Sequence, residues 1–541
     1  MRKFWLASIA LVLVAGVTSA HTQTYKVLYN LGSKSGDPAE PGFANIVQGR
    51  DGNLYSTTNG GGSTGDGAVF KITTGGNLTV LHSFINATDG RFPAGGLILG
   101  SDGHFYGTTA SGGINSFGTM FKTTSGGALT TLHFFAGGTD GMDPTAAPIQ
   151  GMDGNFYGTT VFGGASQGSG WGTVYKITPS GAYKKLHGFT PRRGEPEAPL
   201  IQGIDGKFYG TAFENLIFRV TELGDFKELF DFGFNPQDGY IPIGPLVQGG
   251  DGNFYGTTSQ GGSGVNGGQG VVFKMTPAGT LAVLYKFTGQ GDEEYPVGGL
   301  VQATDGNFYG TTSGNQSADC GTIFRITSAG NFTTLYTFPG DRSTGCRSNG
   351  PLLQQTNGIL YGTTQSGGTG NNDGGVIFSL DLGLPPFVRF LPEASRVGQT
   401  VGIFGQGLTG TTAVSFNGAP ASFTFVSDTY LTASVPSGAA TGFVTVTTPS
   451  GTLTSNKKFQ VRPQVLSFSP ASGPVGTSVV ITGVSLGGAT RVTFGSTQTS
   501  FTQNSDTQVT ATVPSGALTG HIGVTTTGAA SYGQTAFTVT P

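Results

Sequence analysis

The chain has 541 residues, of which 11% are charged and 96 are glycine, and its formal net charge is −3. A weakly charged, near-neutral chain offers no electrostatic basis for binding nucleic acid or an anionic membrane surface. Glycine without a three-residue period excludes collagen, and 11% aromatic residues exclude a disordered chain. Strand-forming runs between glycine-rich turns instead predict an all-β fold.

The first twenty residues have the pattern of a secretory signal peptide. Arg2 and Lys3 precede an apolar stretch over residues 4–17, and small residues lead to Ala20, after which we expect cleavage. No later segment approaches the roughly 20 consecutive apolar residues of a membrane span. Residues 535–541 carry no hydrophobic tail. We therefore expect an exported, soluble protein that does not insert into a membrane.

An eight-residue motif, DGNFYGTT, recurs with small changes along the chain. A period near fifty residues with internal strand patterns is typical of a propeller or a solenoid. Each unit contains four short strands, which in the second unit are GGLILG, HFYGTT, GTMFKTT and LTTLHFF. Four strands per unit is the count of a β-propeller blade. The motif begins at Asp51, Asp102, Asp153, Asp205, Asp251, Asp305 and Asn357, with spacings of 51, 51, 52, 46, 54 and 52 residues.

The two ends of the repeat array favour a propeller over a solenoid. The seventh unit lacks a fourth strand, and a segment with the matching apolar pattern, residues 25–31, stands at the front of the predicted mature chain. Pairing of this strand with the last unit would close the ring and remove exposed strand edges. We therefore predict a seven-bladed β-propeller over residues 21–384, closed by the strand at residues 25–31.

The repeated Asp-Gly pair lies between two apolar strands and predicts a tight hairpin turn in which both turn residues have positive φ. A calcium loop would need oxygen ligands at fixed offsets. Two positions after the first residue of the motif, three units have His104, Lys207 or Ile359, and none of these side chains offers a suitable oxygen. The motif also lacks the tryptophan that follows in a sialidase-type Asp-box. We therefore interpret the motif as a structural turn.

Three histidines, His82, His133 and His187, occupy one position near the end of the fourth strand. Other units have tyrosine or phenylalanine at this position. A position that accepts all three aromatic side chains is typical of packing rather than of metal binding. We therefore expect no metal ion at these histidines and no cofactor in the protein.

The connections between strands differ in length on the two faces of the predicted ring. The first and third turns of each unit are short and share one face, which we call the short-turn face. The second connection and the connection between units are longer and share the opposite face, the long-loop face. Long loops on a rigid scaffold often carry binding groups. Cys320 and Cys346 both fall on the long-loop face, and in an exported protein they predict one disulfide.

Candidate ligand-binding residues are those on the long-loop face that depart from the repeat. Trp171 is the only tryptophan after the predicted signal peptide, and it lies in a glycine-rich loop. An aromatic platform beside arginine and carboxylate groups suits a sugar or a peptide. The alternative is that these are solvated loop residues. The charged candidates in two connections between units are Arg192, Arg193, Glu195, Glu197, Asp292, Glu293 and Glu294.

After Pro385 and Pro386 the repeat period changes. Two units, residues 385–462 and 463–541, align with a shift of 78 residues. Their alternating strand patterns predict two small β-sandwiches. The segments SPASGPVGTSVVITG, ATRVTFG and ATVPSGALTG resemble immunoglobulin-like IPT/TIG domains. This resemblance implies a stalk or an adhesive module.

The repeat array in turn resembles the bacterial tandem repeats named Gloeo/Verruco, or GloVer, through GTVYKITPSG, LHSF and GLVQATDGNFYGTT. The resemblance covers most of residues 25–382 and implies an exported bacterial repeat protein. It supplies no catalytic motif. Members of this family often carry a surface-anchoring end, whereas here two sandwich units follow the array. We therefore expect release or noncovalent retention at the cell surface.

Three functions are compatible with these observations. The one we favour is an extracellular, non-catalytic binding or adhesion protein, a monomer whose ring recognises a glycan or a surface protein and whose sandwiches form a stalk. The second is a carbohydrate-active hydrolase or lyase that uses the propeller cavity, which requires paired carboxylates or a histidine base. Glu195, Glu197 and Glu294 are candidates without a supporting motif. The third is a purely structural surface or matrix protein.

Overall fold

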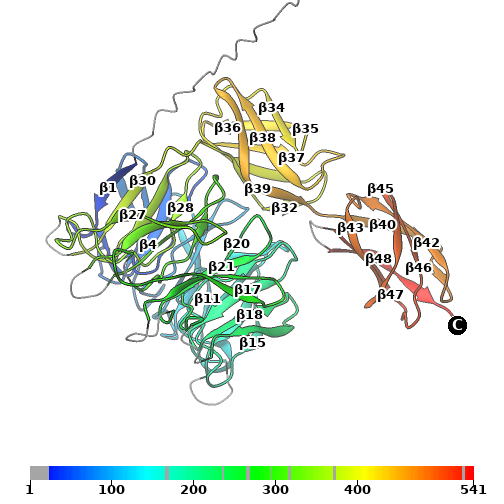
Figure 1. Ribbon diagram of the computed structural model, residues 1–541, viewed down its shortest axis with the longest axis horizontal. Helices are drawn as coiled ribbons and strands as arrows, with labels where there is room; N and C mark the ends of the chain where they lie inside the picture. Colours follow the sequence, from blue (N-terminus) through cyan, green and yellow to red (C-terminus); the bar gives the residue numbers. More distant parts are fainter. Residues whose placement is uncertain are drawn as a thin grey trace, which may run out of the picture.

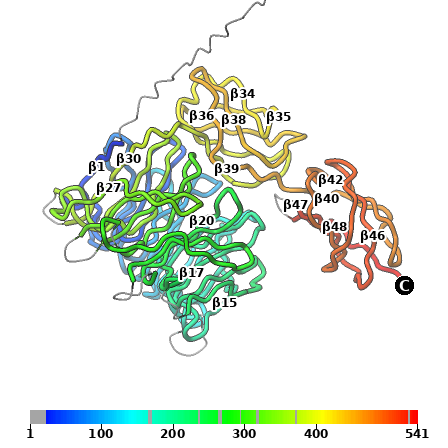
Figure 2. The backbone as a smooth tube through the Cα atoms, in the orientation of Figure 1, coloured from blue at the N-terminus to red at the C-terminus, as the bar shows by residue number. Residues whose placement is uncertain are grey.

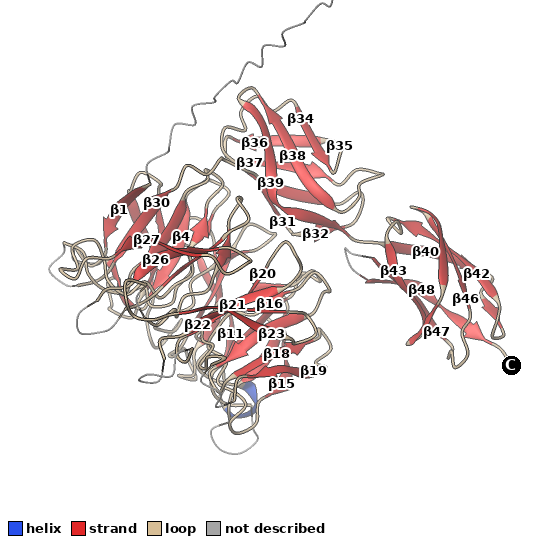
Figure 3. Cartoon of the chain, in the orientation of Figure 1, coloured by secondary structure: helices blue, strands red, loops and turns tan. Residues whose placement is uncertain are grey.

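The computed structural model describes residues 23–164, 170–233, 237–262, 268–292, 294–314, 319–369, 373–526 and 530–541. The predicted signal peptide and Glu293 lie outside these residues. Over the described ranges the regular structure is β, apart from one 3-10 turn, η1 (Gly138–Asp140), as Figure 3 shows. No helix in the same ranges is long and apolar enough to cross a membrane.

Residues 24–381 form seven four-stranded antiparallel sheets, counted over the described part of the chain, and we call each sheet a blade. The first three blades are β3 (Val47–Gln48), β4 (Leu54–Thr58), β6 (Ala68–Ile72) and β7 (Leu78–Ser83); β8 (Ile98–Leu99), β9 (Phe105–Thr109), β10 (Thr119–Thr123) and β11 (Leu129–Phe134); and β12 (Ile149–Gln150), β13 (Phe156–Thr160), β14 (Thr173–Ile177) and β15 (Tyr183–Gly188). A short pair of strands, β2 (Pro38–Ala39) and β5 (Gly60–Gly61), lies beside the first blade.

The remaining four blades repeat this order. They are β16 (Ile201–Gln202), β17 (Phe208–Ala212), β18 (Leu216–Val220) and β19 (Phe226–Asp231); β20 (Val247–Gln248), β21 (Phe254–Thr258), β22 (Val271–Met275) and β23 (Leu281–Lys286); β24 (Val301–Gln302), β25 (Phe308–Thr311), β26 (Thr322–Ile326) and β27 (Phe332–Thr337); and β28 (Leu353–Gln354), β29 (Leu360–Thr363), β30 (Val376–Asp381) and β1 (Thr24–Asn30). In the last blade the outer strand comes from the start of the chain, because β1 pairs antiparallel with β30. Figure 2 shows these two strands side by side.

The repeated FYGTT segment is the second strand of its blade and is buried along its whole length. Its tyrosine packs against the phenylalanine of the same segment in the next blade, for example Tyr157 against Phe208, with ring centroids 3.9 Å apart. Its glycine makes room for an aromatic ring of the third strand. A Cβ on Gly256 would stand 2.6 Å from the ring of Phe273. The motif therefore joins neighbouring blades through their aromatic side chains.

The Asp-Gly hairpin differs from its predicted geometry in one respect. Only the glycine has positive φ, as at Gly154 with 83°, while Asp153 keeps a negative φ. The reason lies in the aspartate side chain, which accepts a bond from the backbone of Asn155 at 3.1 Å and one from the Tyr157 hydroxyl at 2.7 Å. The turn is therefore a type I turn followed by a left-handed glycine.

One glutamine per blade joins adjacent short turns, except in the second blade, where Leu99 stands instead. Gln202 donates to the carbonyl of Gly206 in its own turn at 2.8 Å and accepts from the backbone N–H of Met152 in the preceding blade at 2.8 Å. Gln48 forms the corresponding link from the first blade back to the last, accepting from Thr356 N–H at 3.2 Å. These links brace the short-turn end of the ring.

Residues 389–539 form two β-sandwiches, each with a four-stranded and a five-stranded sheet. The all-β fold predicted from the sequence, a propeller followed by two immunoglobulin-like sandwiches, is confirmed. The first contains β31 (Arg389–Leu391), β33 (Thr400–Phe404), β37 (Tyr430–Ser434) and β36 (Phe423–Ser427), packed on β32 (Ala394–Ser395), β39 (Gly451–Val461), β38 (Gly442–Thr448), β34 (Ala413–Phe416) and β35 (Ala419–Ala421). The second contains β40 (Gln464–Ser469), β42 (Ser478–Val484), β46 (Gln508–Thr512) and β45 (Phe501–Ser505), packed on β41 (Ser472–Gly473), β48 (Ala530–Val539), β47 (Gly520–Thr526), β43 (Ala489–Phe494) and β44 (Thr497–Thr499).

The first sandwich packs against the short-turn face of the propeller, as Figure 1 shows. The hydroxyl of Thr429 donates to the carbonyl of Arg50 at 2.7 Å, and the Arg50 guanidinium lies 4.9 Å from the ring centre of Tyr430. Phe404 and Tyr430 also belong to one hydrophobic cluster with Tyr55 of the first blade. The short-turn face is therefore partly covered, and the long-loop face lies on the opposite side of the ring.

Candidate functional site

At one position in every loop between blades, a residue other than glycine has a left-handed backbone, with φ between 56° and 62°; two of the loops contain a second such residue, Arg192 or Arg342. In six of these loops the residue after the common position is proline, and in the seventh it is Ser348. The following residue is buried in every case, whereas none of the seven left-handed residues is buried. We call them the rim residues: Glu40, Phe92, Asp143, Glu195, Ile241, Tyr295 and Arg347.

The backbone of each rim residue is held from two sides. The N–H of Glu195 donates to the carbonyl of Trp171 in the preceding blade at 2.8 Å, and its carbonyl accepts from the N–H of Phe213 in its own blade at 3.0 Å. The same pair of bonds holds Tyr295, through Gln269 and Ser313. At Ile241 the N–H donates to the Asn215 side chain instead, at 2.8 Å. The rim side chains themselves take no part in these bonds.

A left-handed conformation costs a non-glycine residue roughly 1–2 kcal/mol. Branched and aromatic residues such as Ile241 and Tyr295 have no short polar group that could relieve this cost. Glycine occupies most other positive-φ positions of this glycine-rich chain, yet it occupies none of the seven rim positions. Strained residues that persist in this way are typical of functional sites. The rim side chains are therefore the best candidates for ligand contacts.

Four carboxylates on the long-loop face, those of Asp143, Glu195, Glu197 and Glu294, have raised pKa values. Burial raises the pKa of Glu197, and the neighbouring charge of Glu195 raises it further. Glu195 is affected in the same way, by burial and then by Glu214. Burial also raises the pKa of the rim residue Asp143. Desolvated carboxylates of this kind are enriched in binding and catalytic sites.

Asp153 and two other aspartates of the short turns show the opposite shift. Burial also acts on Asp153, but the hydrogen bonds that it accepts from Lys176, Asn155 and Tyr157 outweigh it and lower its pKa. Each of these partners belongs to the turn or to the adjacent strand. The short-turn carboxylates are therefore saturated by structural contacts, in contrast to those near the rim.

Trp171, the predicted aromatic platform, is half-buried and packs against a blade core that includes Val174 and Phe189. Its loop lies next to the connection that carries the charged candidates, because its carbonyl accepts from Glu195. Trp171 therefore has a packing role that the sequence pattern did not reveal.

The two arginines of this connection have different surroundings. Arg193 forms an ion pair with Asp231 of the neighbouring outer strand, and Glu228 lies 3.8 Å away. Arg192 is exposed and has a positive φ of 63°. Arg192 is therefore the better placed of the two to contact a ligand.

Asp292 was chosen as a candidate because it departs from the repeat in sequence, but its contacts recur in other blades and are structural. Its side chain is 4% exposed and accepts from the Tyr285 hydroxyl at 2.8 Å and from the N–H of Thr288 at 2.9 Å. Asp89 has the equivalent contact with His82 at 2.6 Å. The sequence pattern missed this aspartate because its partner is histidine in some blades and tyrosine in others.

The fourth-strand histidines pack on neighbouring rings, as predicted. His187 stacks on Phe226 at a centroid distance of 3.7 Å, and His133 on Tyr183 at 4.6 Å. Burial and the charge of Lys185 lower the pKa of His187 to about 4. At neutral pH His187 is therefore uncharged.

Two further predicted residues lie beside the rim. Glu294 is half-buried next to Tyr295, and burial raises its pKa, whereas Glu293 lies outside the described residues. Cys320 and Cys346 form a disulfide with an S–S distance of 2.11 Å, and the carbonyl of Cys320 accepts from the N–H of Arg347 at 3.0 Å. The disulfide therefore braces one rim residue.

Comparison of the seven connecting loops in the sequence could have located the rim. A variable residue precedes a proline in six of them, but the variable position alone gives no sign of its left-handed backbone. The repeated motifs of the strands are uninformative here, since the rim lies between them. Of the candidates chosen from the sequence, Glu195 is the one that belongs to the rim.

Family models match the whole array and both sandwiches. The Gloeobacter/Verrucomicrobia repeat matches residues 16–216, 125–301 and 263–391, and the IPT/TIG domain matches residues 385–461 and 463–539. No curated protein matches the chain in sequence.

Several solved structures share parts of the fold. A streptogramin B lyase is 16% identical, with 66% of this chain and 97% of that chain covered and a TM-score of 0.46. A fungal alcohol oxidase of the AA5 family in complex with copper is 14% identical, with 78% and 97% covered and a TM-score of 0.46. The surface glycan-binding protein PbSGBP-B from Prevotella bryantii is 19% identical, with 28% and 41% covered and a TM-score of 0.22. With TM-scores below 0.5, we transfer neither activity nor ligand from any of them.

Proposed function

The chain belongs to the Gloeobacter/Verrucomicrobia repeat family and carries two IPT/TIG domains, and from this premise we propose that it is an exported, non-catalytic recognition protein. The propeller, residues 21–384, is the head, and the sandwiches, residues 385–462 and 463–541, are the stalk. Residues 1–20 direct its export, and it acts as a monomer at or beyond the cell surface. Its ligand is a glycan or a surface protein.

The observation that carries this proposal is the ring of left-handed, non-glycine rim residues. Their backbone is held by the loops around them, so the fold does not need their side chains. The rim offers acidic, aromatic, aliphatic and basic groups, and this diversity suits selective recognition of a polar ligand better than a uniform structural contact. The first sandwich packs on the opposite face and leaves the rim accessible.

The test replaces rim residues with glycine, which suits the left-handed backbone. We expect Tyr295→Gly and Arg347→Gly to keep or slightly raise the melting temperature, because the strain is relieved. Both variants should lose at least tenfold in ligand affinity. Ligands are first sought on a glycan array with residues 21–541, with and without calcium, and then by pull-down from cell envelopes.

Asn417→Gly is the matched control, since Asn417 also has a positive φ, of 48°, but lies in the first sandwich. It should leave binding unchanged. Rim variants that melt several degrees lower while binding normally would assign the rim a packing role and overturn the proposal.

A second candidate function, a carbohydrate-active hydrolase or lyase, is favoured by one observation. Burial raises the pKa of both Glu195 and Glu197, which is the direction of shift that a general acid needs. Release of reducing sugar by the wild type and its loss in Glu197→Gln, with an unchanged melting temperature, would support this function. Equal binding and no turnover in both proteins would exclude this role of Glu197.

A further inference from the structure

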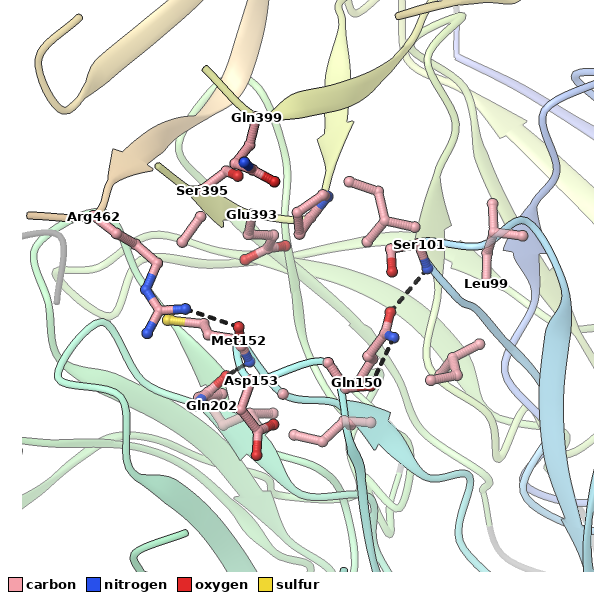
Figure 4. A pocket seen from close by; sticks show the side chains of 18 of the residues that line it. Leu99, Ser101, Gln150, Met152, Asp153, Gln202, Glu393, Ser395, Gln399 and Arg462 are labelled. Atoms are coloured by element: carbon pink, nitrogen blue, oxygen red, sulfur yellow. Dashed lines mark hydrogen bonds between the residues drawn. The ribbon is translucent and has the colours of Figure 1, made fainter. Parts of the chain in front are cut away.

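A pocket of about 670 Å³ lies between the short-turn face of the propeller and the first sandwich. The propeller side comes from the first strands β8, β12 and β16 and from turn 151–154, and the sandwich side from residues 391–399 together with Lys457 and Arg462. Figure 4 shows Met152 and Gln150 facing Glu393, Ser395 and Gln399 across the pocket. This volume lies within the range of small-molecule sites, ~300–1,000 Å³.

The polar groups on the propeller side are already paired. Gln150 accepts from the N–H of Ser101 at 2.8 Å and donates to the carbonyl of Gly154 at 3.1 Å. Asp153 accepts from its own turn and from Lys176. What this wall adds to the pocket is aliphatic surface, from the half-buried residues Ile98, Ile149 and Ile201.

The sandwich side contributes two guanidinium groups, from Arg396 and Arg462, and neither forms an ion pair with another described residue. Arg462 donates to the neutral carbonyl of Met152 at 2.9 Å, as Figure 4 shows. Burial lowers the pKa of Arg462, and the charge of Arg396 lowers it further, while Glu222 and Asp153 act in the opposite direction. The two arginines are therefore close enough to repel each other.

The two carboxylates that line the pocket are each paired with a lysine rather than with either arginine. Glu393 is paired with Lys457 at 3.0 Å, and the charge of Lys457 lowers the pKa of that carboxyl. The carboxylate of Asp153 is held by Lys176 at 2.8 Å. Two guanidinium groups without a carboxylate of their own form a favourable site for a bound oxyanion, which each can engage through paired N–H donors.

We propose that this pocket binds a small carboxylate with a short aliphatic body. Arg396 and Arg462 hold the carboxylate, and the aliphatic wall formed by Ile98, Ile149 and Ile201 covers the body of the ligand. An aliphatic wall without an aromatic ring favours an alkyl chain over the flat face of a sugar. The site is separate from the rim, because it opens on the short-turn face and joins two domains.

Titration calorimetry of residues 21–541 with hexanoate, acetate, glucuronate and sulfate tests the proposal. Hexanoate should bind most tightly, with a negative heat-capacity change from burial of its chain. Its affinity should fall as salt is added, because salt screens the arginines. We expect Arg396→Gln and Arg462→Gln each to weaken hexanoate binding at least tenfold. Arg491→Gln, an exposed arginine of the second sandwich, should leave it unchanged.

Arg396→Gln is the deciding variant, because Arg462→Gln also removes the bond to Met152 and so perturbs the domain contact. Unchanged hexanoate affinity in Arg396→Gln, or no binding of any of the four probes, would overturn the proposal. Sulfate that binds as tightly as hexanoate would remove the aliphatic part of the inference. Glucuronate that binds more tightly than hexanoate would reassign the pocket to acidic sugars.

Discussion

At the residue scale, the glutamines that join the short turns stabilise the ring. From the sequence alone, these polar side chains would be taken for residues that only contact solvent. Gln202 links two blades through the Gly206 carbonyl and the Met152 N–H, both at 2.8 Å. Gln202→Leu leaves both backbone groups without this partner, and we expect a loss of about 1–3 kcal/mol in unfolding free energy. Urea denaturation followed by tyrosine fluorescence measures it.

Gln290→Leu is the control for the change of Gln202. Gln290 is exposed in the same propeller, and its side chain forms no hydrogen bond with a described residue. It should change the unfolding free energy by less than about 0.5 kcal/mol. Equal losses in the two variants would mean that the blade-to-blade link contributes nothing specific.

The short-turn aspartates predict the response to acid. Burial acts against the charge of Asp251, but bonds from Lys274, Asn253 and Tyr255 outweigh it and hold its pKa below the unfolded value of about 3.9. The contribution of Asp251 to the free energy of unfolding is therefore present above pH ~4 and is lost as the pH falls. Asp251→Asn should lower the free energy of unfolding at pH 7 by about 1 kcal/mol or less, and with it the melting temperature, and its difference from the wild type should shrink as the pH falls below ~4.

Asp225→Asn, in an exposed turn without these partners, should follow the wild type throughout this pH range. A difference between Asp251→Asn and the wild type that persists unchanged at pH 2 would contradict this assignment. Melting followed by circular dichroism across this pH range makes the comparison.

At the element scale, β1 completes the last blade from the other end of the chain. Tyr25 stacks on Tyr336 with a centroid distance of 3.9 Å and donates to the carbonyl of Thr344 at 2.7 Å. Removal of residues 21–31 leaves the edge of β30 unpaired, and we expect oligomers on size-exclusion chromatography. A synthetic peptide of residues 23–31 should restore the monomer, and a scrambled peptide should not. A monomeric truncated protein would show that β1 is dispensable.

The elements that could be predicted from the sequence are those with a strong local signal. Alternating apolar residues and Asp-Gly turns marked the strands of residues 47–381, because burial and turn geometry both act within a few residues. The rim could not be read in this way, since the left-handed backbone of Tyr295 results from bonds to Gln269 and Ser313 in two different blades. The role of Asp292 was missed for a different reason: its partner Tyr285 lies only seven residues away, but the equivalent partner of Asp89 is a histidine, so the pair does not recur as one residue pattern.

At the scale of the whole molecule, the first sandwich lies over the seam where the ring closes. Thr356 of the last blade donates to the carbonyl of Gly405 in this sandwich at 3.2 Å and also accepts from Gln48 of the first blade at 2.8 Å. Gln355 adds a bond to the carbonyl of Gly52. The sandwich therefore reinforces the junction between the last and the first blade, which residues 31–46 also connect after β1, and it acts as a clasp for the propeller.

Truncated chains distinguish a sandwich that stabilises the closed ring from one that is only attached to it. A chain ending at residue 462 keeps the seam contacts, and its propeller should melt like that of the full chain. A chain ending at residue 384 loses Gly405 and the apolar cover of Phe404 and Tyr430, so we expect a melting temperature several degrees lower. Hydrogen exchange should accelerate first in β3 and β28, on either side of the seam. If exchange instead rises evenly around all blades, the sandwich stabilises the ring without closing it.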